Sequence, residues 1–361
     1  MKRFLSFVLA VALLSFTLIS CKKSVEPQPA ETPAVSQQSE QKAASKESEP
    51  VTLTVYAYDS FISEWGPGPV VAKNFEAAYG IKINLVSMGD SGQVLQRAIL
   101  EKKNPKADVV IGVDNNLLYQ SLEEDIFLPY DSPALSHIDP SLIFDKSLHV
   151  LPFDYGFFSI IYDSEVIKTP PRSLEDLTDP IYKDRLIIMD PRTSSPGLGF
   201  LLWTIAAYGD DYTSYWERLQ PSLLTITGGW DTGYGLFTNG EAPMVLSYTT
   251  SPAYHVEYED TTKYQAAMFD AGHYLQIEGA GIVNGTKHLE EAKLFIDYLL
   301  GKEAQEVIPL TNWMYPTYTD IDLPESFDYA PLPKKMLSID SKTITEDLDT
   351  WLDTWTSIMS K

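Results

Sequence analysis

The chain has 361 residues, a formal net charge of −23 and one cysteine. Its 50 acidic residues outnumber its 27 basic residues and are spread along the sequence, which argues against nucleic acid or an anionic membrane surface as a partner. The single cysteine lies at the end of an N-terminal apolar stretch, so disulfides, thiolate catalysis and cysteine-bound metals are excluded from the rest of the chain.

The N-terminal segment has the pattern of a secretory signal. Lys2 and Arg3 precede the apolar stretch FLSFVLAVALLSFTLI, which ends in LISC. A small residue directly before a cysteine resembles a bacterial lipobox, in which Cys21 becomes the lipidated first residue of the mature chain. The apolar run is shorter than the roughly 20 residues that a bilayer span needs, which argues against an uncleaved anchor helix. We therefore predict a signal peptide over residues 1–20 and lipidation of Cys21.

Residues 22–50 have the composition of a disordered tether. They contain no aromatic residue, Leu, Ile or Gly, so they cannot bury enough apolar surface to offset the entropy of an ordered chain. We therefore predict that the lipidated cysteine and its disordered tether occupy residues 21–50, and that a folded body follows them.

The body of about 310 residues exceeds what a single hydrophobic core usually supports, which predicts two domains. Alternating β-branched residues and short apolar runs predict its strands, and apolar residues at helical spacing predict its helices. The predicted strands are 51–58, 81–88, 107–113, 185–190, 223–228, 243–250 and 274–285, and a second α/β unit is expected to start near 149–164. The predicted helices are 68–80, 92–104, the segments after Asn116 and Ser195, 234–241, 288–308 with a break near Gly301, and 344–361. This alternation predicts doubly wound α/β sheets.

Three kinds of reactive site lack support in the sequence. The five histidines lie far apart, with no HxH or HExxH spacing, which argues against a zinc site. No GxxxxGK[ST] or GxGxxG motif supports nucleotide binding. GDSG at 89–92 resembles a serine-protease nucleophile, but every histidine follows it in the chain. The simpler interpretation is a strand-to-helix turn in which Asp90 or Ser91 caps the following helix.

Six strand-to-helix junctions are rich in polar and aromatic residues. They are YAYDSFISEW, MGDSG, GVDNN, DPRTSSPG, GGWDTGYG and SYTTSPAYH. In doubly wound sheets, ligands lie outside the carboxyl ends of the strands, where such junctions occur. Six of them from two domains, without a catalytic triad or a metal cluster, predict a binding cleft between two lobes that close over a ligand.

Aromatic residues near these junctions are candidates for contact with the ligand. They are Tyr58, Trp230, Tyr248, Tyr254 and Trp313. For each of them the alternative interpretation is packing in the core. Rings on a cleft suit a flat cationic heterocycle, through stacking and cation–π attraction.

The junction DPRTSSPG suits a phosphate attached to such a heterocycle. We expect Ser195 to be the N-cap of the following helix and Pro196 to be its first residue. Free amide groups at a helix start, together with the hydroxyls of Ser194 and Ser195, bind anions well. No base is evident that would activate either serine, so a role as nucleophile is not expected.

Eight stretches of the body also carry a resemblance to a known family. They are LTVYAYDSFISEWGPGPVV, KADVVIGVDNNLL, PFDYGFF, DPRTSSPGLGFLLW, GYGLF, LSYTTSPAYH, GHYLQIE and NWMYP, within residues 52–316. In these stretches the chain resembles the thiamine-binding periplasmic proteins of ABC import systems. The resemblance implies an α/β fold of the two-lobed type II periplasmic binding protein kind, with doubly wound sheets and the ligand cleft between the lobes.

Carried over position by position, the resemblance implies a set of ligand contacts and of walls around the ligand rings. The contacts are Asp90, Ser91, Ser194, Ser195, Trp230, Tyr248, Thr249, Thr250 and Ser251, and the walls are Tyr58, Tyr254 and Trp313. MGDSG departs from the family pattern, in which an acidic residue usually precedes the aspartate and a glycine occupies position 91.

The resemblance implies a receptor that binds thiamine or its mono- or diphosphate and delivers it to a membrane permease driven by a cytoplasmic ATPase. We expect lobes of 51–152 with 277–312 and of 153–276 with 313–361, joined by the tether to a lipid anchor in the cell envelope. We further expect a periplasmic monomer that needs no cofactor or metal, binds no nucleic acid, touches the membrane only through its lipid, and is not an enzyme.

Two alternatives remain open at this point. One is a binding protein of the same fold for ferric ion or a polyamine, in which Tyr248 and Tyr254 would serve iron. The other is an enzyme that hydrolyses thiamine compounds, for which the chain offers no cysteine nucleophile.

Overall fold

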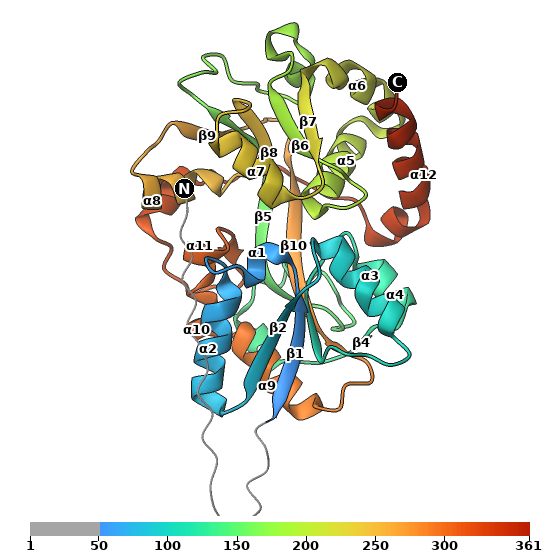
Figure 1. The fold of residues 1–361 in the computed structure, drawn as a ribbon, viewed down its shortest axis with the longest axis vertical. Coiled ribbons are helices and arrows are strands. Elements are labelled where there is room, and N and C mark those ends of the chain that lie inside the picture. Colours follow the sequence, from blue (N-terminus) through green and yellow to red (C-terminus); the bar gives the residue numbers. More distant parts are fainter. Residues whose placement is uncertain (1–50) are drawn as a thin grey trace, which may run out of the picture. The chain divides into compact units, whose positions relative to one another are not determined.

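The protein is described by a computed structural model that covers residues 51–361, so the predicted signal peptide, lipidated Cys21 and tether lie outside the described residues. One mixed sheet runs through these residues in the strand order β2-β1-β3-β10-β5-β8-β6-β7 (Figure 1). Its strands are β1 (Thr52–Ala57), β2 (Lys82–Ser87), β3 (Val109–Asp114), β4 (Phe127–Leu128), β5 (Leu151–Asp163), β6 (Leu186–Met189), β7 (Leu223–Thr227), β8 (Met244–Tyr248), β9 (Tyr264–Ala267), β10 (His273–Val283), β11 (Tyr315–Pro316) and β12 (Met336–Leu337).

Helices follow most of the longer strands, as the alternating pattern predicted. The α-helices are α1 (Asp59–Ile62), α2 (Pro67–Tyr79), α3 (Ser91–Glu101), α4 (Leu118–Glu123), α5 (Ser195–Tyr208), α6 (Tyr212–Leu219), α7 (Trp230–Thr238), α8 (Ser251–Glu259), α9 (Leu289–Leu299), α10 (Lys302–Gln305), α11 (Ile308–Thr311) and α12 (Ser341–Met359). Short 3-10 helices are η1 (Pro133–His137), η2 (Glu175–Thr178), η3 (Pro180–Tyr182), η4 (Gly209–Asp211), η5 (Gln220–Ser222) and η6 (Glu325–Tyr329). No helix within residues 51–361 is both long and apolar enough to span a membrane.

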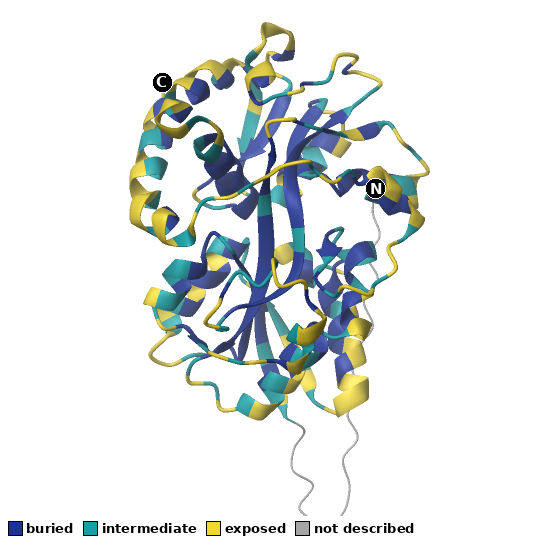
Figure 2. Ribbon diagram, turned by 180° about the vertical axis from the view of Figure 1, so that it is seen from behind, coloured by how far each residue is buried: buried dark blue, intermediate teal, exposed yellow. Residues whose placement is uncertain are grey.

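The sheet has two halves joined by its two long central strands. In the first half, β1 pairs in parallel with β2 and β3, and in the second half β6 pairs in parallel with β7 and β8. β10 and β5 pair antiparallel with each other, with β3 on one side and β8 on the other (Figure 1). Figure 2 shows these central strands buried along most of their length. The predicted lobe boundaries stay a prediction, because residues 51–361 belong to one compact unit.

Burial explains why the strand pattern could be predicted. All six residues of β3 are buried, as expected for the continuous apolar run at 107–113. β5 and β10 are also buried almost throughout, which requires cover on both faces of the sheet. The predicted break near Gly301 is confirmed, since α9 ends at Leu299 and α10 begins at Lys302.

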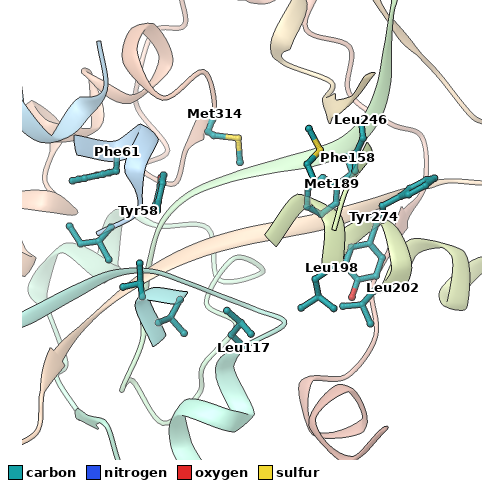
Figure 3. Close-up of a cluster of buried hydrophobic side chains, with 14 of the residues drawn as sticks. Tyr58, Phe61, Leu117, Phe158, Met189, Leu198, Leu202, Leu246, Tyr274 and Met314 are labelled. Atoms are coloured by element: carbon teal, nitrogen blue, oxygen red, sulfur yellow. The ribbon is translucent and has the colours of Figure 1, made fainter. Parts of the chain in front are cut away.

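Close approach between helices and strands in the second half depends on two glycines. A Cβ at Gly199 would lie 2.0 Å from the ring of Phe158, so only glycine lets α5 pack on β5 there. A Cβ at Gly233 would lie 2.6 Å from Met189 Cε, so α7 likewise packs on β6. Figure 3 shows Phe158 and Met189 together in the buried cluster. Because α5 follows β6 and α7 follows β7 in the chain, both helices start near the carboxyl ends of these strands.

Two helix starts in this region differ from the predictions. α7 begins at Trp230 and not at residue 234. The prediction missed its first turn because two glycines there weaken the helical pattern, although Gly233 is needed for packing. The N-cap of α5 is Ser194 and not Ser195, so Pro196 is the second helical residue. No helix was predicted at α6, and the strand-to-helix junction SYTTSPAYH implied a helix at α8 without giving its range.

The C-terminal helix α12 packs against α6 of the second half and α4 of the first half. Trp355 is buried on this helix, with its ring edge-to-face at 5.8 Å from Trp216. Leu348, Leu352 and Met359 pack against the core, so the apolar stripe predicted for the tail is confirmed.

Candidate functional site

A cavity of about 1000 Å³ lies where the junctions of both halves meet. Nine of the twelve predicted site residues line it. They are Tyr58, Asp90, Ser91, Ser195, Trp230, Tyr248, Ser251, Tyr254 and Trp313. Within the described chain, the other three predicted residues, Ser194, Thr249 and Thr250, are buried beside the cavity but do not line it.

One wall of the cavity consists of aromatic side chains from α7, β8 and α8. Trp230 is the first residue of α7, its Nε1 donates to Ser247 Oγ at 2.9 Å, and its ring stacks on Tyr234 at 4.8 Å. The hydroxyls of Ser247 and Ser251 lie 2.8 Å apart. Trp230 is only partly buried, because one part of its ring faces the cavity. Trp230 therefore lines the cavity and also packs against the hydrophobic core.

A buried histidine holds the second layer of this wall. Tyr234 Oη lies 2.8 Å from His255 Nε2, and His255 Nδ1 lies 2.8 Å from Glu259 Oε2. Burial lowers the pKa of His255, so the imidazole is neutral at pH 7 and orients both neighbours by hydrogen bonds. Tyr254 meets Trp313 edge-to-face at 5.4 Å. Trp313 has a φ of 55°, a left-handed conformation that is strained for a tryptophan.

The junction GVDNN supports the cavity from behind. Tyr248 Oη donates to Gln276 Oε1 at 2.6 Å, and Gln276 Nε2 donates to Asp114 Oδ2 at 2.9 Å. Burial raises the pKa of Asp114 to about 6, although the amides of Asn116 and Leu117 also donate to it. This junction therefore orients Tyr248 through Gln276 and does not line the cavity itself, whereas the other five predicted junctions do line it.

The lining is acidic. Eight aromatic side chains surround the cavity: Tyr58, Trp65, Trp230, Tyr234, Tyr248, Tyr254, Tyr258 and Trp313. Five carboxylates join them: Asp59, Asp90, Asp231, Glu259 and Glu278. None of the described lining residues is Lys or Arg. A low-dielectric cavity lined by one sign of charge concentrates ligands of the opposite sign, so this cavity favours a cation.

Asp90 connects two helix N-termini. It caps α3 by accepting the Ser91 amide at 2.7 Å, and Gln93 completes the capping box by accepting the Asp90 amide at 3.0 Å. Its Oδ1 also accepts the amide of Ser195, the first residue of α5, at 3.2 Å. Burial raises the pKa of Asp90, and these two amides oppose that shift.

The expected cap at Ser195 is therefore wrong. The N-cap is Ser194, whose side chain makes no capping hydrogen bond, and Asp90 from the first half accepts the amide of Ser195, the first helical residue. The hydroxyls of Ser194 and Ser195 are close enough to the carboxylate to lower its pKa, but neither makes a hydrogen bond of ordinary geometry within residues 51–361. Thr249 and Thr250 likewise hold buried hydroxyls without a partner in the described residues.

Glu278 lies at the base of the cavity and was missed by sequence reasoning. Its Oε2 accepts the Tyr58 hydroxyl at 2.6 Å. Asn312 donates from Nδ2 to Tyr58 Oη at 3.0 Å and also to Asp154 Oδ2. Asp59 and Asp231 were missed too, although they stand inside junctions that had been singled out. Only the register between β5 and β10 brings Glu278 beside Asp154, and no local pattern signals it.

No group of three or more His, Cys, Asp or Glu side chains in the described part of the chain is arranged to hold a metal ion. The aromatic lining and its single sign of charge therefore suit an organic cation better than ferric ion.

Comparisons with known proteins agree with this geometry. Residues 104–346 match the family described as bacterial extracellular solute-binding protein. The thiamine-binding periplasmic protein of Brucella suis is 43% identical over 312 residues, which cover 86% of this chain and 92% of the relative. The corresponding protein of Escherichia coli is 41% identical over 309 residues, covering 86% and 94%. A solved periplasmic thiamin binding protein is 41% identical with a TM-score of 0.82, covering 86% and 97%.

These matches confirm the resemblance stated from the residues and the predicted type II periplasmic binding protein fold. The chain therefore belongs to the bacterial extracellular solute-binding proteins and, within them, to the family of the thiamine-binding periplasmic proteins.

Proposed function

We propose that the protein binds thiamine in this cavity and delivers it to an ABC permease. The observation that carries the proposal is the lining, which combines eight aromatic rings with five carboxylates and no Lys or Arg among the described residues. Thiamine consists of two flat rings joined by a methylene bridge, and its thiazolium ring has a fixed positive charge. Aromatic faces and carboxylates both attract such a cation.

The aromatic wall supplies the ring contacts in this proposal. The rings that line the cavity and face the ligand are Trp230, Tyr248, Tyr254, Tyr58 and Trp313, with Tyr254 and Trp313 in edge-to-face contact. Trp230 and Tyr248 are held in place by hydrogen bonds behind their rings, so the stacking surface is formed before the ligand arrives.

The polar residues supply charge and hydrogen bonds. Asp90, Ser91 and Ser251 face the ligand directly, and Ser195 faces it at the start of α5. The hydroxyls of Ser194, Thr249 and Thr250 are buried without a partner among the described residues, which leaves them available to the ligand in this proposal.

The phosphate esters of thiamine bind the same cavity in this proposal, with the phosphate toward Ser194 and Ser195. The carboxylate of Asp90 already accepts the Ser195 amide, so a phosphate has to share that helix end with an anion. We therefore expect thiamine to bind more tightly than its monophosphate, and the monophosphate more tightly than the diphosphate.

The proposal also covers the route of delivery. The relatives are periplasmic binding proteins rather than enzymes, and a solute-binding protein of an importer hands its ligand over unchanged. In this proposal the protein is a monomer. Lipidation at Cys21 and a tether over 21–50 would hold it beside its permease in the cell envelope.

Calorimetric titration of the mature protein tests the ligand. Thiamine is expected to bind at one site per chain and to be recovered intact by mass spectrometry, whereas spermidine and ferric ion are expected to bind far more weakly. Tighter binding of either competitor would overturn the proposal, and recovery of cleaved thiamine would indicate a hydrolase.

The anchor is tested separately. Cys21→Ser is expected to leave an unlipidated precursor that lacks the acyl mass and is released from the membrane fraction. An acylated N-terminal peptide in this variant, or none in the wild type, would contradict lipidation.

A further inference from the structure

Two buried carboxyl groups meet at the base of the cavity. Glu278 on β10 and Asp154 on β5 are directly paired across neighbouring strands. Glu278 is 6% exposed and lines the cavity, and Asp154 is fully buried behind it. Their nearest polar neighbours are the Tyr58 hydroxyl on Glu278 and the Asn312 amide on Asp154.

Among the described residues, the cavity lining offers no Lys or Arg to this pair. Three acids or phenols face Glu278 from other elements: Asp90 from the start of α3, Asp114 from β3 and Tyr248 from β8. Asp154 Oδ1 is buried and has no hydrogen-bond partner among the described residues, which is costly for a charged carboxylate and tolerable for a neutral one. Two neighbouring carboxylates in such surroundings cannot both ionise without a large penalty.

The direction of the pKa shifts agrees with this geometry. Burial raises the pKa of Glu278 well above its ordinary value, and the Asp154 charge adds to the shift. Burial also raises the pKa of Asp154, against the effect of the Asn312 amide. Tyr58 stays a neutral donor, because burial and the two carboxyls raise its pKa as well.

We propose that the Glu278–Asp154 pair holds one proton in the ligand-free protein and releases it when the cationic ligand enters the cavity. The inference rests on the proposed binding of thiamine. The carboxylic O–H bond breaks, its electron pair stays on the carboxylate, and the proton passes to the buffer, while the ligand is unchanged. Glu278 is thereby the residue whose new charge faces the ligand cation.

Proton release makes binding depend on pH. A complex that loses one proton gains about tenfold in affinity per pH unit, over the range in which the ligand-free pair is still protonated. The gain stops once the pH exceeds the pKa of the ligand-free pair. A cavity that recognised the cation with permanently ionised carboxylates would show no such slope.

Calorimetry in paired buffers measures the proton directly. Thiamine is titrated into the mature protein at about pH 7, in phosphate and in Tris, whose ionisation enthalpies differ widely. The difference in observed enthalpy is expected to correspond to about one proton released per ligand bound. Binding with the same enthalpy in both buffers would overturn this inference and leave thiamine binding intact, whereas no binding in either buffer would overturn the proposed function itself.

Two variants assign the proton. Glu278→Gln is expected to bind thiamine more weakly, to release almost no proton and to lose the pH slope. Asp154→Asn is expected to lower the number of protons released as well. Without the neighbouring Asp154 charge, Glu278 is already largely ionised before the ligand binds. Circular dichroism checks that each variant folds, and the wild-type titration stands on its own if one does not.

Asp59→Asn is the matched control. Asp59 is an exposed carboxylate on the same cavity, so its removal is expected to weaken binding while about one proton is still released. Proton release that survives in Glu278→Gln, or that disappears in Asp59→Asn, would show that the pair is not its source.

Discussion

The two walls of the cavity are built from different chemistry. The second half of the sheet supplies an aromatic wall that neutral partners hold in place. Ser247 is hydrogen-bonded to Trp230, Gln276 to Tyr248, and His255 to Tyr234. The first half and β10 supply the carboxyls of Asp59, Asp90 and Glu278, which form the acidic wall. Asp231 and Glu259, on α7 and α8 of the second half, add to this charge. The comparison teaches that the two walls depend on different properties. Packing and neutral hydrogen bonds fix the shape of the aromatic wall, whereas the number of protons bound to its carboxyls fixes the charge of the acidic wall.

The largest expected effect separates the aromatic wall from the core. Trp216→Ala is expected to lower the free energy of unfolding by about 3–5 kcal/mol, because Trp216 is fully buried against Phe200 and Trp355. Trp230→Ala is expected to cost less stability and to weaken thiamine binding by about 1–3 kcal/mol. Urea unfolding and calorimetry measure the two quantities. If Trp230→Ala lost much stability and bound thiamine with unchanged affinity, Trp230 would be a core residue and not a ligand contact.

The buried carboxyl of Asp114, behind Tyr248 and Gln276, should make the stability of the ligand-free protein depend on pH. The pKa of Asp114 is about 6 in the folded chain, about two units above its value in an unfolded chain, so the folded state binds more protons between these values. Stability is therefore present at low pH and is lost as the pH rises through about 4 to 6, by about 3 kcal/mol for this group.

Urea unfolding as a function of pH measures that loss. Asp114→Asn is expected to flatten the profile in this range, whereas Trp230→Ala is the control that should leave its slope unchanged. A profile that rises steadily from about pH 4 to about pH 6 would contradict the shifted pKa of Asp114.

Asp90 belongs to the acidic wall and also to two helix starts. Asp90→Ala is expected to cost about 0.5–2 kcal/mol of stability through the lost cap of α3, and to weaken thiamine binding through the lost charge. Asp340→Ala is the matched control, because Asp340 caps α12 and does not line the cavity within the described residues. It should lose comparable stability and no affinity. Equal affinities for the two variants would remove Asp90 from the binding site.

The smallest expected effect concerns the start of α5. Ser194→Ala with Ser195→Ala is expected to change stability by less than about 0.5 kcal/mol, since neither hydroxyl makes a capping hydrogen bond in the described chain. Thiamine affinity should change little. If this helix end binds the phosphate group, the double variant should lose more affinity for thiamine monophosphate than for thiamine. Equal losses for both ligands in calorimetry would show that it does not.

The sequence predicted the elements better than the contacts between them. Apolar runs such as 107–113 and a break near Gly301 are local signals, so β3 and the end of α9 could be predicted. Polar residues at strand ends likewise pointed to five junctions that line the cavity. These predictions need only neighbouring residues.

Contacts between distant segments could not be predicted in this way. The pairing of Glu278 with Asp154 depends on the register of two strands that are far apart in the chain. The role of Asp90 at the start of α5 depends on the meeting of the two halves, and a serine beside a proline gave a plausible but wrong local cap. The resemblance to a family supplied residues of the aromatic wall, but it did not reveal the buried carboxyl pair.

The hydrogen bond from the Ser195 amide to Asp90 gives the protein a built-in spectroscopic reporter. It joins a backbone amide of one half to a carboxylate of the other, beside the ligand cavity. The chemical shift of that amide proton is sensitive to the charge and distance of its acceptor, and its exchange with deuterium is slow only while the bond is closed. A single resonance in a nitrogen–proton spectrum would therefore follow how often the two halves separate, without any label being attached to the protein.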